Sequence, residues 1–203
     1  MKNKKYTIIY WTSIGLSIIL ILGLNLIFYT SASTLLWFLI TFCVVVVSTF
    51  LIAYIASLFG TKFYEPEKKI FHVFKFEKKL YESVGIKKWK DKIPELGKQL
   101  AGFDKSTLVE PDNPEYIHKF LIENCKGSFL HTISIIYSIL SLFILIFFLP
   151  YPFILTMWLP TTVVAVIVHS LSLMILRYTR PKLRVLYERL KRNKKGENKN
   201  EIK

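Results

Sequence analysis

The chain has 203 residues, of which 52% are hydrophobic and 21% are charged, with a formal net charge of +14. This composition is too apolar for an ordinary soluble domain of that length. A nucleic-acid-binding protein would carry its basic residues within a soluble fold, whereas here they are separated from long apolar runs. The sequence therefore predicts a membrane protein whose basic residues face anionic lipid, with no nucleic-acid partner.

Four apolar stretches predict an all-α membrane protein with four transmembrane helices arranged as two hairpins. None of them contains Asp, Glu, Lys or Arg, and each is long enough to cross a hydrocarbon core of about 30 Å at about 1.5 Å per residue. They run from Tyr6 to about Tyr29, from about Leu35 to Leu58, from Ser128 to Leu149 and from Phe153 to Leu176. In the last stretch, Pro160 either kinks the helix or begins it.

The charged residues divide the chain into four parts and set its expected orientation. Two hairpins (1–61 and 127–187) flank a charged amphipathic segment (62–126), and a basic tail (188–203) follows that we expect to be disordered. All 28 Lys and Arg residues lie in residues 1–5, 62–126 and 177–203. The positive-inside rule then predicts that both termini and the charged segment are cytoplasmic. The first apolar run is too long for a signal peptide, so we expect a retained span.

Within the charged segment, residues 68–85 mix apolar side chains with Lys and Glu. This mixture favours a helix lying in the membrane interface, with its apolar face down and its lysines reaching the phosphates. The alternative is a helix packed on a cytoplasmic core. The two cysteines, Cys43 and Cys125, lie in different environments and are expected to be free thiols.

Chemistry has few candidates, because no glycine-rich phosphate loop, nucleophile elbow or Cys-x-x-Cys motif is present. Two histidines, His131 and His169, fall inside predicted spans, roughly 5 and 12 Å below the cytoplasmic boundary, and so can line one cavity. Glu123, Gly127 and His131 recur every four residues on one helix face. Each histidine either contacts substrate or only hydrogen-bonds a neighbouring helix.

Three arginines at the end of the fourth span, Arg177, Arg180 and Arg184, suit bidentate binding of phosphate, as in an acyl-CoA or a lipid head group. They are equally well interpreted as ordinary positive-inside anchors. The sequence by itself leaves both interpretations open.

Several stretches resemble the glycosyl-4,4'-diaponeurosporenoate acyltransferase family. The residues that carry the resemblance are Phe63–Pro66, Tyr81, Gly85–Pro94, Phe103–Lys105, Phe120–Gly127 followed by His131, and Arg177–Leu183. Members are small bacterial membrane proteins, whose known activity acylates the sugar of a glycosylated carotenoid, the last step towards staphyloxanthin. The resemblance implies a multi-pass protein of the bacterial cell membrane.

The resemblance also implies a chemistry, direct transfer of a fatty acyl group from an acyl thioester such as acyl-CoA to a lipid-borne hydroxyl. His131 is the expected general base, with Glu123 orienting it. Arg177 and Arg180 would hold donor phosphate or the developing oxyanion, and His169 would contact substrate. Trp89, Lys90 and Asp91 would shape a cytoplasmic lid. Neither a cofactor nor a metal is expected.

A different class of function fits the same residues. In that alternative the protein is a non-enzymatic scaffold or accessory subunit, whose basic loop recognises anionic lipid. A small-molecule transporter is a third interpretation, but spans without an acidic residue give little means of coupling to ions. The enzyme and the scaffold predict different results at Glu123 and His131, since only the enzyme needs them for turnover.

Overall fold

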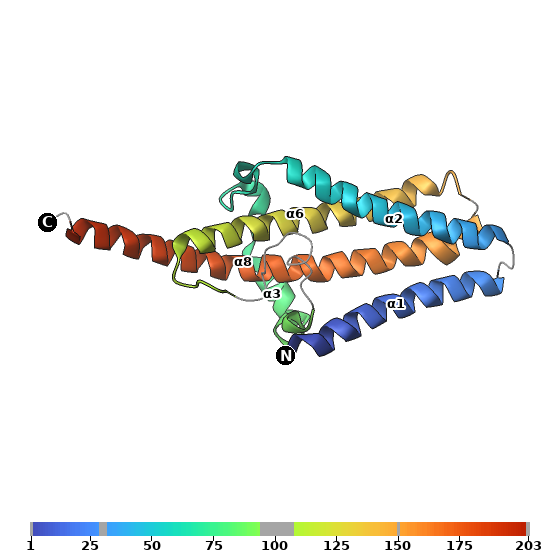
Figure 1. Ribbon diagram of the computed structural model, residues 1–203, viewed down its shortest axis with the longest axis horizontal. Coiled ribbons are helices and arrows are strands. Elements are labelled where there is room, and N and C mark those ends of the chain that lie inside the picture. Colours follow the sequence, from blue (N-terminus) through green and yellow to red (C-terminus); the bar gives the residue numbers. More distant parts are fainter. Residues whose placement is uncertain (1, 29–31, 94–107, 150, 202–203) are drawn as a thin grey trace. The chain divides into compact units, whose positions relative to one another are not determined.

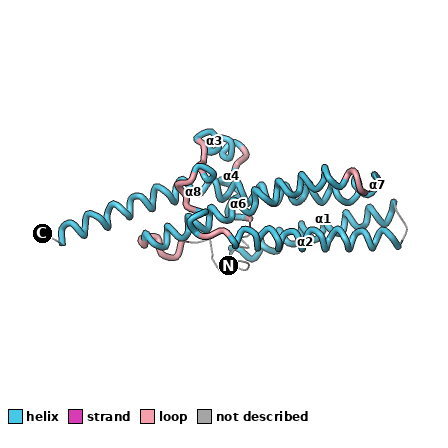
Figure 2. Tube along the Cα trace, turned by 90° about the horizontal axis from the view of Figure 1, so that it is seen from above, coloured by secondary structure: helices cyan, strands magenta, loops and turns pink. Residues whose placement is uncertain are grey.

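The computed structural model describes residues 2–28, 32–93, 108–149 and 151–201. Within these residues every regular element is a helix (Figure 2), which confirms the all-α prediction. The long helices are α1 (Lys2–Phe28), α2 (Ala32–Leu58), α6 (Pro114–Leu145) and α8 (Leu159–Glu201), as Figure 1 shows. The short ones are η1 (Thr61–Tyr64), η2 (Lys69–Phe71), α3 (Lys75–Ser83), α4 (Ile86–Trp89), η3 (Lys90–Lys92), α7 (Tyr151–Phe153) and the π-helix η4 (Ile154–Trp158).

Four helices of the described chain are long and apolar enough to cross a membrane, as the sequence predicts. Their outward side chains are apolar, and many are exposed: Leu20 is 62% exposed, Ile27 73% and Val47 64%. Such surfaces would be unfavourable in water but match the hydrocarbon core of a bilayer. The exposed apolar faces of α1 and α2 are therefore the expected lipid-facing surfaces.

Two helices extend well beyond the apolar stretches. The α6 helix starts at Pro114, where Asn113 caps it: its Oδ1 accepts the amides of Glu115 at 3.0 Å and Tyr116 at 3.3 Å. Proline at the first helical position fits this start, because its missing N–H would have no partner there. One helix therefore runs from the charged segment into the third apolar stretch.

At the other end, α8 continues to Glu201, although the sequence favours a disordered tail from residue 188. Extending an existing helix adds a hydrogen bond per residue without a new nucleation step. The tail is also rich in Lys, Arg and Glu, which are good helix formers. Its lack of apolar residues therefore does not prevent it from being helical.

The fourth span starts through α7 and η4 before α8 begins. Pro160 is the second residue of α8, so it lies at the start of that helix. Proline has no N–H to give the carbonyl of Thr156 four residues earlier. The fully buried Asn25 of α1 supplies the missing donor, with its Nδ2 at 2.8 Å from that carbonyl oxygen. Asn25 Oδ1 in turn accepts from Thr156 Oγ1 at 2.6 Å.

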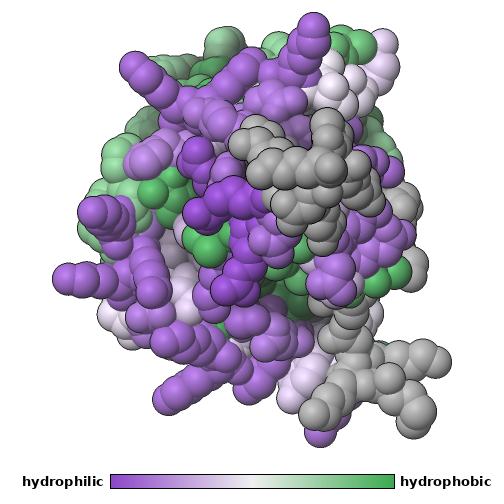
Figure 3. All heavy atoms as spheres, turned by 90° about the vertical axis from the view of Figure 1, so that its left-hand side faces the viewer, coloured by the Kyte–Doolittle hydropathy of each residue, from purple (hydrophilic) through white to green (hydrophobic). Residues whose placement is uncertain are grey.

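The chain divides into two compact units. The first contains α1, α2, α7, η4, the part of α6 from Phe129 and the part of α8 up to Ser172. The second contains residues 59–91, the start of α6 up to Ser128, and α8 from Leu173. The end of the molecule where the C-terminus lies in Figure 1 presents mainly hydrophilic side chains (Figure 3). This agrees with a sequence in which all Lys and Arg residues lie outside the apolar stretches.

The segment over residues 68–85 is not one continuous helix, because η2 ends at Phe71 and α3 begins at Lys75. Its apolar side chains divide into two sets. Phe71 and Tyr81 are buried in the second unit, whereas five others are more than half exposed: Ile70, Phe74, Phe76, Leu80 and Val84. The interfacial position of this segment stays a prediction, and the exposed set is the face that would enter the interface.

Candidate functional site

The two histidines of the C-terminal hairpin lie together in the first unit. Nδ1 of His131 on α6 is 3.0 Å from Nδ1 of His169 on α8, and the ring centroids are 5.3 Å apart. Both side chains are half-buried. Helical depth in the sequence predicts that the two can line one cavity; the structure brings them into contact, with His169 among the residues that line a pocket.

A hydrogen bond between two Nδ1 atoms fixes which protons the pair can carry. One ring must donate its Nδ1–H, so that its Nε2 keeps a lone pair when the ring is neutral. The other ring accepts at Nδ1 and, when neutral, carries its proton on Nε2. The neutral pair therefore presents one basic Nε2 and one Nε2–H donor. Proton transfer to and from a hydroxyl needs a base and a donor of this kind.

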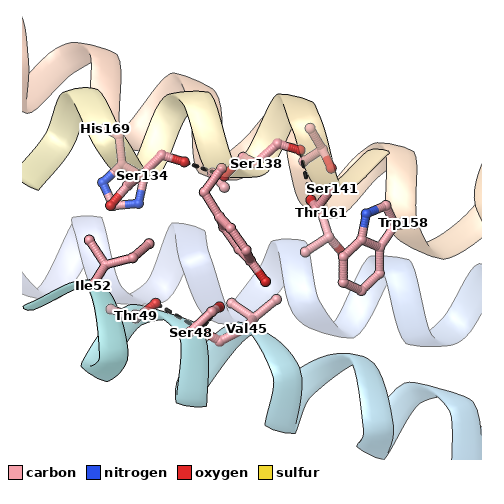
Figure 4. A pocket seen from close by; sticks show the side chains of 13 residues that line it. Val45, Ser48, Thr49, Ile52, Ser134, Ser138, Ser141, Trp158, Thr161 and His169 are labelled. Atoms are coloured by element: carbon pink, nitrogen blue, oxygen red, sulfur yellow. Dashed lines mark hydrogen bonds between the residues drawn. The ribbon is translucent and has the colours of Figure 1, made fainter. Parts of the chain in front are cut away.

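His169 also lines a pocket in the first unit (Figure 4). Its walls come from α2, α6, η4 and α8, and serine and threonine make up much of the lining. The lining residues are Val45, Ser48, Thr49, Ile52, Ser134, Tyr137, Ser138, Ser141, Trp158, Thr161, Thr162, Ala165 and His169. A polar pocket lined by one member of a histidine pair, within helices that can span a membrane, is the main candidate site of the first unit.

In the second unit, Arg177 of α8 holds Glu77 of α3. Its Nε and Nη2 donate to the two carboxylate oxygens, each at 2.6 Å, and Nη2 also donates to the carbonyl of His72 at 2.8 Å. Tyr81 Oη and the Phe74 amide add hydrogen bonds to the same carboxylate, at 2.7 and 2.9 Å. Bidentate pairing of this kind is strong and geometrically specific. It fixes α3 against α8.

These contacts shift the pKa values of Glu77 and Tyr81. Burial alone would raise the pKa of Glu77, but the hydrogen bonds from Arg177, the Phe74 amide and Tyr81 outweigh it and lower the pKa to about 2. Burial and the hydrogen bond to Glu77 raise the pKa of Tyr81 to about 12. At neutral pH the carboxylate is therefore charged and the phenol protonated.

A pH prediction follows from Glu77. Its pKa in the folded protein lies below the ordinary value of 4.5, so its stabilising contribution is complete above about pH 4.5 and is lost as pH falls towards 2. We expect the thermal midpoint to fall over this range, and to fall less in Glu77→Gln. Thermal unfolding of the detergent-solubilised protein measures it. Glu67→Gln is the control, since Glu67 is exposed, and an equal slope in all three proteins would contradict the assignment.

Arg180, also in the second unit, is almost completely buried at 3% exposure. All three of its guanidinium nitrogens donate: Nε to Asn124 Oδ1 at 2.8 Å, Nη1 to the Phe71 carbonyl at 2.7 Å, and Nη2 to Ser128 Oγ. The guanidinium also lies over the Phe71 ring, 5.7 Å from its centroid. Arg177 and Arg180 thus both join the segment after α2 to the C-terminal helices, a structural role that differs from both phosphate binding and positive-inside anchoring.

The predicted lid residues also belong to the second unit. Trp89 packs beside Tyr81, Ile86 and Tyr178, and its Nε1 donates to the Val84 carbonyl at 3.0 Å. Lys90 and Asp91 pair with each other at 2.8 Å, and Asp91 is mostly exposed. The tryptophan is therefore part of a hydrophobic cluster, whereas the two charged residues lie at its surface. Their role as a lid stays a prediction, and Phe103–Lys105 of the sequence resemblance lies outside the described residues.

Glu123 is half-buried on α6, in the second unit. Burial, together with the negative charge of Glu123, raises the pKa of Tyr64. The orienting role of Glu123 towards His131 is untested and stays a prediction. The hydrogen-bond partner that the structure shows for His131 is His169, which sequence reasoning assigned to substrate contact.

Other residues of the two sites were missed by sequence reasoning. Glu77, Asn124 and Ser128 are ordinary polar residues in sequence, and only the fold brings them to the arginines. Ser134, Ser138 and Ser141 did carry a signal, because spacings of four and three residues place them along one helix face. No group of three metal-binding side chains is found in the part of the chain that the structure describes.

Comparison with known proteins decides the family. The family model for glycosyl-4,4'-diaponeurosporenoate acyltransferase matches residues 67–189, which is more than half of the chain. The chain belongs to this acyltransferase family. The matched residues include α3, α6, His131, His169, Arg177 and Arg180. Neither curated proteins nor solved structures gave a match. The family therefore places the chain among acyltransferases of the carotenoid type.

Proposed function

We propose that this protein is an integral membrane O-acyltransferase. It moves a fatty acyl group from an acyl thioester to a hydroxyl of a lipid-borne acceptor, a glycosylated carotenoid, at the cytoplasmic leaflet. The observation that carries the proposal is the His131–His169 pair beside a polar pocket, in a chain of this family. Ionisable side chains within spanning helices cost free energy and are rare, so a pair of them marks a candidate functional site.

His131 is the proposed general base. With its Nδ1–H donated to His169 Nδ1, its Nε2 takes the proton of the acceptor hydroxyl as the oxygen attacks the thioester carbonyl carbon. The carbon–sulfur bond then breaks, and the proton passes to the departing sulfur, which leaves an ester and a free thiol. His169 holds the base in the required tautomer and faces the charge that forms on it, as the orienting member of a catalytic triad does.

Direct transfer is favoured over an acyl-enzyme intermediate. Cys125, the one thiol near the charged segment, is fully buried in the second unit. Its interior position suits a structural thiol and not a reactive nucleophile. The donor would be acyl-CoA or a similar thioester, whose phosphates are attracted by the basic cytoplasmic segments.

The scaffold alternative has its own support. Arg177 and Arg180 are engaged with protein groups, and the exposed set of Ile70, Phe74, Phe76, Leu80 and Val84 lies among lysines, a pattern typical of an interfacial lipid-binding surface. These features also suit an enzyme that takes a lipid substrate. They therefore do not displace the enzyme as the leading proposal.

The direct test is transfer by the purified protein in lipid nanodiscs. With palmitoyl-CoA carrying a radioactive acyl group and a glucosyl carotenoid carboxylate as acceptor, we expect a radioactive ester with the mass of the acceptor plus one acyl group. Free CoA should appear in equal amount, and the sugar-free carotenoid should give no product. Absence of ester and of acyl-dependent CoA release, from protein that is folded in the nanodisc, would favour the scaffold.

A further inference from the structure

The pocket beside the histidine pair is unusually rich in hydroxyls for its position. Seven of its thirteen lining residues are serine or threonine, and all lie on helices that can span a membrane. Figure 4 shows the pocket extending from His169 and Ser134 at one end, past Ser138 and Ser141, to Trp158 at the other. Hydroxyl groups within spanning helices often bond only to their own helix. The question is what they leave available to a ligand.

Five of these hydroxyls already donate a hydrogen bond to a carbonyl of their own helix. Ser48 and Thr49 donate to the Val45 carbonyl at 3.0 and 2.8 Å. Ser138, Ser141 and Thr161 likewise donate to carbonyls three or four residues earlier, at 2.7 to 2.9 Å. A hydroxyl has one proton and two lone pairs, so each of these oxygens remains an acceptor. The pocket wall therefore consists largely of hydrogen-bond acceptors.

One donor in the lining has no partner. Trp158 is 6% exposed, and its Nε1 makes no hydrogen bond within the described chain. An indole N–H can only donate, and buried polar groups without a partner are rare in folded proteins. The unpaired Nε1, in a wall of acceptors, indicates a ligand that both accepts and donates hydrogen bonds.

We propose that this pocket binds the sugar of the acceptor, with Trp158 Nε1 donating to a sugar oxygen and the serine and threonine oxygens accepting from sugar hydroxyls. This inference rests on the proposed function, since it assigns the sugar of the proposed acceptor to this pocket. A sugar supplies many donors and acceptors in a small volume, which matches a pocket lined by hydroxyl oxygens and one indole N–H. An alkyl chain would leave both the acceptors and the indole N–H unpaired.

The position of the pocket gives the assignment a consequence for the reaction. His169 lines one end of it and is hydrogen-bonded to His131, so the pocket that would hold the acceptor reaches the histidine pair. Trp158 is then a binding residue for the acceptor and not a participant in proton transfer. Its loss should raise KM for a glycosylated acceptor and leave kcat nearly unchanged.

The kinetic test compares Trp158→Phe with Trp37→Phe, both in nanodiscs. Phenylalanine keeps an aromatic ring and removes only the donor, while Trp37 packs against Phe153 and is not among the pocket's lining residues. We expect Trp158→Phe to raise KM for the glucosyl carotenoid roughly 3- to 10-fold, the usual effect of one hydrogen bond. Trp37→Phe should leave it unchanged. An unchanged KM in Trp158→Phe would overturn the assignment.

A second readout does not depend on turnover. Decyl glucoside carrying a diazirine on its first chain carbon is photo-crosslinked to the nanodisc protein, and the labelled peptides are mapped by mass spectrometry. We expect labelling of the pocket-lining parts of α6 and α8, displaced by unlabelled decyl glucoside but not by decanol, and several-fold weaker in Trp158→Phe and Ser138→Ala. Displacement by decanol as well, or labelling elsewhere, would contradict a sugar site.

The two experiments separate this inference from the function on which it rests. If the pocket is labelled as expected but no ester forms, the sugar site stands and the transferase proposal fails. If ester forms while labelling and KM are insensitive to Trp158, the transferase stands and the sugar site is wrong.

Discussion

Replacing His131 with glutamine will reduce acyl transfer by roughly 100-fold or more, because a positioned general base contributes about 10²- to 10⁴-fold to a proton-transfer step. Glutamine can still donate its amide N–H to His169 Nδ1, which lies 3.0 Å from the His131 ring nitrogen, so the contact between α6 and α8 is preserved. The amide cannot act as a base. The loss should therefore appear in turnover, with membrane insertion and thermal stability close to those of the unsubstituted chain.

His118→Gln is the matched control for this prediction. His118 lies on the same helix and is also part-buried, but it contacts Glu65 at 3.1 Å and packs on Tyr187, both in the second unit. We expect His118→Gln to keep transfer within a few-fold of the unsubstituted chain. Steady-state rates of ester formation in nanodiscs measure both. Equal activity of His131→Gln and the unsubstituted protein would remove the base from the mechanism.

The second large effect is on stability. Replacing Arg180 with methionine keeps most of the packing volume but leaves Asn124 Oδ1 and the Phe71 carbonyl without their donor. Each buried polar group left unpaired costs about 1–3 kcal/mol. We expect a loss of roughly 3 kcal/mol or more, seen as a lower unfolding temperature and poorer recovery from detergent.

Arg184→Met is the control for Arg180→Met. Arg184 is one turn further along α8 and is exposed, and substitutions at such positions usually change stability by less than about 0.5 kcal/mol. If Arg180→Met were as stable as Arg184→Met and lost only transfer activity, Arg180 would be a substrate-binding residue, as the family resemblance first suggested. The structural role assigned to Arg180 would then be wrong.

Much of the fold could be predicted because membrane spans are specified locally. A run of apolar residues must form its own backbone hydrogen bonds in lipid, so Leu35–Leu58 predicts a helix despite its run of valines. The extensions of α6 and α8 were harder to predict, since polar residues continue an existing helix as readily as they end one. The break before Lys75 inside the charged segment had no clear sequence signal.

The candidate site divides in the same way. The proximity of His131 and His169 could be predicted from the rise per residue, which gives the depth of each histidine along its own span. The pairing of Arg177 with Glu77, one hundred residues earlier, depends on tertiary packing that no spacing encodes. Trp158 was overlooked because a tryptophan in a span is usually interpreted as packing or an interfacial anchor, and only the structure reveals that its Nε1 has no partner.

The central claim, that this chain transfers an acyl group to a lipid-borne hydroxyl, is tested most directly by mass spectrometry of lipid and pigment extracts. A host that makes glycosylated carotenoid would express either the unsubstituted chain or His131→Gln at an equal level in the membrane. We predict pigment species heavier by one fatty acyl group only with the unsubstituted chain. Identical extracts from the two strains would contradict an acyltransferase that uses this acceptor and would make the scaffold the leading interpretation.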